Sequence, residues 1–181
     1  MNSFVCCVLT SAFLMGSSGA GSASLPRAEQ TLRKTLFCQK YRCIPQPDTL
    51  GTPVKTGQTR SSLRLAGKAL ERFYYLSEVS LDATFQKTNA QNKGGLVRLA
   101  LNLQSSIPGD GATPKELEDA FGQMRRLTLE FTTQFLPAKA ALEQAKKCDF
   151  ASGKTLNTRI RVEGQNLRLT CDFFTFGIEV L

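Results

Sequence analysis

The sequence contains no histidine and no tryptophan among its 181 residues. Without histidine, the chain cannot build a Ser-His-Asp triad, a Cys-His pair or a histidine-ligated zinc hydrolase site. No serine stands three residues before a lysine, so the serine acylase pattern S-x-x-K is missing as well. Acid–base chemistry would have to come from carboxylates, lysine, tyrosine or thiols. We therefore predict no cofactor and a role that is not enzymatic.

Charged residues are missing from the N-terminal segment, where Arg27 is the first. Phe4–Met15 is an uncharged and mostly apolar run of 12 residues, and the small residues Gly16–Ala23 follow it. This order predicts a secretory signal peptide over residues 1–23, with cleavage after Ala23 or after Ala20. The run is too short to cross a bilayer, which needs roughly 20 apolar residues. The alternative is an N-terminal core helix or strand. We expect a secreted or periplasmic protein with no stable membrane span after processing.

The formal net charge of the chain is +8, and residues 24–181 keep all of it. Such a charge attracts anionic partners, and we expect an anionic polymer or an acidic protein. The alternative is an ordinary solvated basic surface. We do not expect nucleic acid as a partner, because no aromatic motif for base stacking is interleaved with the basic residues.

Four cysteines follow the predicted signal peptide: Cys38, Cys43, Cys148 and Cys171. An even number in an exported chain predicts two disulfides, for which three connectivities exist. Local geometry favours Cys38–Cys43 and Cys148–Cys171. A zinc site made of four thiolates is the alternative, although no C-x-x-C pair is present to support it.

The apolar pattern changes its period along residues 24–181, which we interpret as a single α+β domain. The stripe in residues 24–41 predicts a first helix. Residues 44–60 carry three prolines and two glycines without a period, which is typical of a surface connection. Residues 62–75 fit a strand or a helix, and the pattern slightly favours a helix.

The middle of the chain has a clear strand period followed by a helix signal. Residues 79–85 and 97–103 alternate apolar and polar side chains, which predicts an antiparallel hairpin with one buried face. Thr113, Pro114 and Glu116 then form the capping box and first turn of a long helix. Pro137 is expected to kink or split this helix, and its continuation brings Cys148 to face inward.

The last segment predicts a second hairpin. Residues 156–162 alternate, and so do residues 167–173. If Gly164 and Gln165 form a two-residue turn, Cys171 lies opposite Thr158 on the buried face. The apolar residues Phe173, Phe174 and Phe176 indicate a strand end that is covered on both sides. The expected architecture is an antiparallel sheet built from two hairpins, with amphipathic helices packed on one face.

The hairpin and the helix start Thr113-Pro114-Lys115-Glu116-Leu117-Glu118 carry a family resemblance. Residues 79–136 are similar to the C-terminal half of bacterial sensory-transduction-regulator-like domains, which share the fold of type III secretion chaperones. The resemblance implies an α+β protein-binding fold with no catalytic site, and it assigns no functional residue.

Three arginines of the last hairpin are the candidate binding residues. With the turn above, Arg161 lies opposite Arg168 on the outward face, and Arg159 lies nearby. Like charges in direct cross-strand positions are destabilising unless an anion or a carboxylate such as that of Glu163 neutralises them. We therefore expect these arginines to bind an anionic partner; exposed arginines separated by water are the alternative.

The function that fits these features is an exported protein-binding or envelope-associated module. The alternative is a carboxylate-dependent hydrolase of an envelope polymer, for which Glu78 and Asp82 are the nearest candidates. The alternative interpretation of Glu78 and Asp82 is that they are ordinary exposed acids, since no tryptophan is present to form a sugar-binding platform. A structural protein of the cell surface is a third possibility, which self-association would identify.

Overall fold

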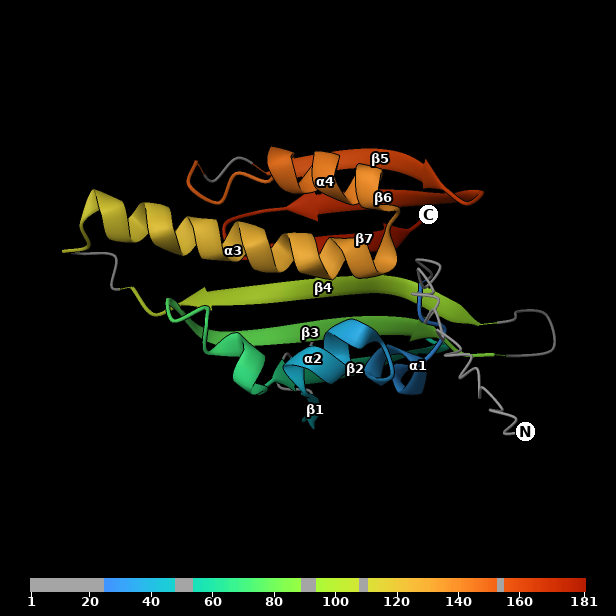
Figure 1. Ribbon diagram of the computed structural model, residues 1–181. Helices are drawn as coiled ribbons and strands as arrows, with labels where there is room; N and C mark the ends of the chain where they lie inside the picture. The colour runs from blue at the N-terminus through green and yellow to red at the C-terminus, as the bar shows by residue number, and fades with distance from the viewer. Residues whose placement is uncertain (1–24, 48–53, 89–93, 108–110, 153–154) are drawn as a thin grey trace, which may run out of the picture.

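The computed structural model describes residues 25–47, 54–88, 94–107, 111–152 and 155–181, so the predicted signal peptide lies outside the described residues. A seven-stranded antiparallel sheet runs through the molecule in the order β1-β2-β3-β4-β7-β6-β5 (Figure 1). The α+β class is confirmed. The elements in chain order are α1 (Glu29–Arg33), α2 (Leu36–Tyr41), β1 (Cys43–Gln46), β2 (Gln58–Leu65), the 3₁₀ turn η1 (Lys68–Leu70), β3 (Leu76–Gln86), β4 (Gly95–Ser105), α3 (Pro114–Phe135), α4 (Ala138–Lys147), β5 (Leu156–Val162), β6 (Gln165–Cys171) and β7 (Thr175–Val180).

Two meanders make up this sheet. One precedes α3 and α4 in the sequence, and the other follows them. β1 to β4 pair in chain order, and β5 to β7 do the same. β4 pairs with β7, and this joins the two meanders into one sheet. The sheet is therefore larger than the two predicted hairpins, because β1, β2 and β7 add a strand each.

The core is formed by buried side chains from both the strands and the helices. The alternate β3 residues Val79, Leu81 and Ala83 are buried, while the polar residues between them are half-buried. α3 contacts β3 and β4, and the rings of Phe37 in α2 and Phe131 in α3 meet edge to face at 5.5 Å. Figure 1 draws all four helices in front of the strands.

The N-terminal predictions need two corrections. The single helix over residues 24–41 is wrong: α1 ends at Arg33, and Thr35 starts α2 by accepting a hydrogen bond from the Cys38 N–H at 3.3 Å. The helix over residues 62–75 is also wrong, because that segment begins as β2. Leu63 and Leu65 are buried and alternate with exposed Arg64, as in a strand. This strand pairs with both β1 and β3.

The interpretation of residues 44–60 as a surface connection is wrong at both ends. β1 occupies the start of this segment and β2 begins at Gln58, while residues 48–53 lie outside the described residues. The prolines misled the prediction. Pro45 lies in an edge strand, where a missing N–H costs no ladder hydrogen bond if it faces outward.

The helix predictions in the middle of the chain are confirmed. The Thr113 hydroxyl accepts from the Glu116 N–H, and the Glu116 carboxylate accepts from the Thr113 N–H at 2.8 Å. Pro137 splits the long helix into α3 and α4. Two leucines of these helices, Leu117 and Leu142, are 36% and 43% exposed.

The disulfides are the predicted pairs. Cys38–Cys43 closes the end of α2 against β1, with 4.9 Å between the α carbons. Cys148–Cys171 links the end of α4 to β6, with 5.7 Å between the α carbons. The second bond closes a loop of 23 residues, and such a loop contributes about 3 kcal/mol through the entropy of the unfolded chain.

A polar cluster fastens α2 and the segment after η1 to α3. Glu130 of α3 accepts hydrogen bonds from the Tyr41 hydroxyl and the Lys40 ammonium, both at 2.6 Å, and forms an ion pair with Arg72. Arg72 also donates to the Tyr41 oxygen at 2.7 Å. Burial raises the pKa of Glu130, but these hydrogen bonds and positive charges outweigh it and lower the pKa below its ordinary value.

We expect Glu130→Gln to lower the free energy of unfolding by about 1 kcal/mol at pH 7, a modest value because the partners are half exposed. A depressed carboxylate pKa stabilises the fold above the pKa of the unfolded chain. The difference from the wild type should therefore shrink as pH falls below about 4.5. Urea denaturation between pH 7 and pH 3 measures this. A constant difference across that range would contradict it.

Candidate functional site

A groove with a volume of about 730 Å³ lies at the end of β3 and β4. Its walls include both candidate carboxylates and no basic side chain. The groove residues are Gln46, Ser62, Glu78, Ser80, Asp82, Asn102, Leu103, Gln104, Ser105, Ile107, Phe174 and Thr175.

Asp82 is held firmly in this groove. Its Oδ2 accepts a hydrogen bond from the Asn102 amide at 2.6 Å, and Asn102 in turn accepts from the Thr175 hydroxyl at 3.3 Å. The other oxygen, Oδ1, is buried and has no hydrogen-bond partner among the described residues. Residues of β3, β4 and β7 therefore fix the direction of this carboxylate.

Glu78 lies on the same strand as Asp82, four residues away. The β3–β4 register is regular from Glu78 to Asp82, so four residues of strand separate the two α carbons by about 13 Å. A retaining pair of carboxyl groups lies only about 5 Å apart. The groove thus holds two acids of the predicted type, and the separation of their α carbons exceeds the spacing of a retaining pair.

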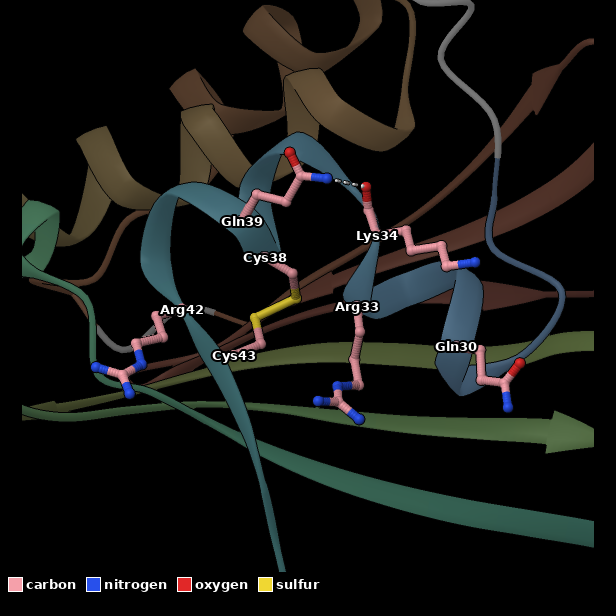
Figure 2. Close-up of a pocket in the computed structure, with 7 residues that line it drawn as sticks. All are labelled: Gln30, Arg33, Lys34, Cys38, Gln39, Arg42 and Cys43. Carbon is pink, nitrogen blue, oxygen red and sulfur yellow. Dashed lines mark hydrogen bonds between the residues drawn. A yellow bond between two sulfur atoms is a disulfide. The ribbon is translucent and has the colours of Figure 1, made fainter.

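A second pocket, of about 440 Å³, lies beside the Cys38–Cys43 disulfide and is basic (Figure 2). Figure 2 shows Arg33 and Arg42 on either side of the disulfide, while Lys34 extends in another direction. Arg33 lies in the last turn of α1, Lys34 is its C-cap, and Arg42 caps α2 in a left-handed conformation. Positive side chains at helix C-termini are accounted for by the carbonyl dipoles there.

The structure corrects the register of the last hairpin. Its two-residue turn is Glu163-Gly164, and both residues have the positive φ that a type I′ turn requires. Arg161 therefore lies opposite Asn166, and Arg159 lies opposite Arg168. The predicted pair of opposed arginines exists, but Arg159 takes the place assigned to Arg161. Cys171 pairs with Leu156 instead of Thr158.

The opposed arginines belong to a longer row that crosses the sheet. Cross-strand partners point to the same face, and each partner in this row is paired with the next. Five steps between strands of about 4.8 Å give the row a length of about 24 Å. We call it the arginine row; from β2 to β5 it consists of Arg60, Thr84, Arg98, Glu179, Arg168 and Arg159.

Glu179 is the residue of this site that sequence reasoning missed. Its carboxylate pairs with Arg168 at 3.0 Å, while the expected partner Glu163 lies in the turn. The signal that would have found it is the alternation after Thr175, where buried Phe176 and Ile178 flank a glycine. Gly177 is required there, because a Cβ would lie 2.6 Å from the Thr170 hydroxyl oxygen.

The prediction that the strand end is covered on both sides is wrong for two of its residues. Phe173 and Phe174 lie in the turn between β6 and β7 and are 49% and 53% exposed. Only Phe176 is buried. Asp172 stabilises the turn by accepting from the N–H groups of Phe174 and Thr175 at 3.1 and 2.8 Å.

Comparison with known proteins adds no assignment to this geometry. No family model matches the chain, and no curated protein or solved structure matches it at a significant level. None of the described helices combines the length and the apolar character needed to cross a membrane. The described residues also contain no group of three or more Cys, Asp or Glu side chains arranged to hold a metal ion.

The opposed pair predicts a stability effect. Arg159→Glu should raise the free energy of unfolding by about 0.5 kcal/mol, because it replaces a like-charge cross-strand pair with an opposite-charge pair. Arg159→Gln should lie between this variant and the wild type. Urea denaturation at low and high salt measures both, and the differences should shrink at high salt. Equal stability of all three proteins at low salt would show that Arg159 and Arg168 do not interact.

Proposed function

We propose that this protein is an exported, non-enzymatic binding module that takes an acidic protein partner on the arginine-bearing face of its sheet. The observation that carries the proposal is the arginine row, in which four of six positions are arginine and one is glutamate. Arginine suits this role because its planar group donates to a carboxylate through two parallel hydrogen bonds.

The arginine side chains on this face, including Arg161 next to the row, are available to a partner to different degrees. Arg98, Arg159 and Arg161 are exposed, and the described residues provide no carboxylate within 4 Å of any of them. Arg168 forms an ion pair with Glu179, so its charge is partly neutralised. We infer that the helices cover one face of the sheet and leave this polar face open. The uncompensated charge then lies on the open face.

Two further features support the secreted or periplasmic location. Both disulfides are of the kind that persists in oxidising compartments and is rare in the cytosol. The apolar run and small residues of 1–23 have the order of a signal peptide. The resemblance of residues 79–136 to protein-binding chaperone-like domains agrees with a partner that is a protein.

The triple variant Arg98→Gln, Arg159→Gln and Arg161→Gln tests the proposal. At about 0.5 kcal/mol for each exposed pair, it should bind immobilised polyglutamate about tenfold more weakly than the wild type. The matched control is Lys115→Gln, Arg126→Gln and Lys139→Gln, which removes the same charge from exposed helix positions. Equal weakening of both variants would contradict the proposal. Clear preference of the wild type for heparin over polyglutamate would indicate an anionic polysaccharide as the partner instead.

One observation favours the hydrolase alternative: the groove encloses Asp82 with one carboxylate oxygen unpaired. Because of the Glu78–Asp82 spacing, we expect the wild type to release no new chain ends from an envelope polysaccharide. We also expect Asp82→Asn to bind polyglutamate as the wild type does. Release of reducing ends by the wild type and its loss in Asp82→Asn would establish the hydrolase.

A further inference from the structure

The two edges of the sheet differ in how they meet another chain. β1 is short, with four residues, and contains Pro45. β5 is a regular strand of seven residues without proline, glycine or bulge. Figure 1 shows these strands at opposite edges of the sheet. Short strands and proline block the addition of a further strand, whereas a long regular edge accepts one.

The turn fixes which backbone groups of β5 face outward. Val162 and Gln165 flank the two-residue turn, so they form a hydrogen-bonded pair. Hydrogen-bonded pairs alternate with pairs whose backbone groups point away from the partner strand. The outward N–H and C=O groups therefore belong to Asn157, Arg159 and Arg161. Among the described residues, these groups have no backbone partner beyond β5.

The same residues carry the charge of the edge. The side chains of Arg159 and Arg161 lie on the polar face and are exposed. A strand paired with β5 would place its own side chains directly beside them. A second copy of this chain, paired through its own β5, would bring arginines against arginines. The charge of the edge thus disfavours self-pairing and favours a strand with acidic side chains.

The core-facing side of β5 determines which residue type fits at the alternate positions of a partner strand, between its acidic residues. Ile160 and Val162 point to the core side but remain half-buried, because β5 has no neighbour beyond it. Apolar residues of an added strand would cover them. A partner strand that alternates acidic and apolar residues therefore matches both faces of β5.

We propose that β5 is a docking edge for an extended segment of another protein in which acidic and apolar residues alternate, bound by strand addition to Asn157, Arg159 and Arg161. This inference rests on the proposed function and specifies how the acidic partner is held. The arginines supply charge, and the backbone of the same residues supplies the hydrogen-bond ladder.

A short peptide of alternating Glu and Val is the probe, and amide hydrogen exchange of the full mature protein is the measurement. Bound peptide should slow exchange at Asn157, Arg159 and Arg161 by at least about tenfold, since these N–H groups gain acceptors. A peptide of the same composition with all Glu residues grouped should bind more weakly. A peptide methylated on alternate backbone nitrogens, which removes its own donors, should lose binding.

Two variants separate the charge from the backbone. Arg159→Gln keeps the outward N–H and should weaken peptide binding several-fold, whereas Arg159→Pro removes that N–H and should abolish it. Arg64→Gln, an exposed arginine of β2 on the same face, is the matched control and should bind the peptide as the wild type does. The methylated peptide keeps the test valid if Arg159→Pro does not fold.

Three results would overturn the inference. Unchanged exchange at the three amides with peptide bound would show that the partner lies on the face of the sheet and not at its edge, while the proposed function would stand. Absence of polyglutamate binding would remove the proposed function and this inference together. Concentration-dependent protection of the same amides without peptide would identify a second copy as the occupant.

Discussion

The pairing of β4 with β7 is the contact on which the continuous sheet depends. These strands are separated in sequence by both long helices, yet five cross-strand pairs join them. Only this pairing extends the arginine row from Arg98 into the C-terminal meander. On its other side, β7 approaches β6 closely at Gly177, where a Cβ would lie 2.6 Å from the Thr170 hydroxyl oxygen. The Cys148–Cys171 bond limits where β6 can return after α4, and so limits the position of β7 as well.

The charge of the protein is distributed in a way that composition alone does not reveal. The groove beside β3 and β4 has two carboxylates and no cation in its walls, although the chain as a whole carries +8. Glu130 is surrounded by cations at the helices, and Glu179 partly neutralises Arg168. Four acids, Glu78, Asp82, Glu130 and Glu179, therefore lie either in the groove or beside basic side chains. At the edge strand β5, Arg159 and Arg161 are exposed, and the described residues provide no carboxylate within 4 Å of either.

Local signals in the sequence predicted the parts of the fold that depend on nearby residues. The capping box at Thr113, the β3–β4 hairpin and both disulfides required only short-range chemistry or an even cysteine count. The β2 strand required knowledge of its neighbours, because the leucines of residues 63–70 fit a helix as well as a strand until β3 and β1 pair with it. At the candidate site, the sequence predicted opposed arginines but missed their register by two residues. Either Glu163-Gly164 or Gly164-Gln165 can form a two-residue turn. The two registers differ by two residues and keep the same side chains on each face, so the apolar pattern of the sequence does not distinguish them.

The register of this hairpin also determines which backbone N–H and C=O groups of β5 point outward. In an antiparallel hairpin, the turn determines which residues direct their backbone groups inward, so a turn of Gly164-Gln165 would have exchanged the outward set. Arg159 and Arg161 would then have presented side chains to the polar face while their backbone groups bonded to β6. With Glu163-Gly164 in the turn, side-chain charge and open backbone groups belong to the same residues. An edge of this kind resists a second copy of itself by repulsion and offers a complete set of donors to an acidic strand. The proposed preference for an acidic strand therefore depends on the geometry of one turn.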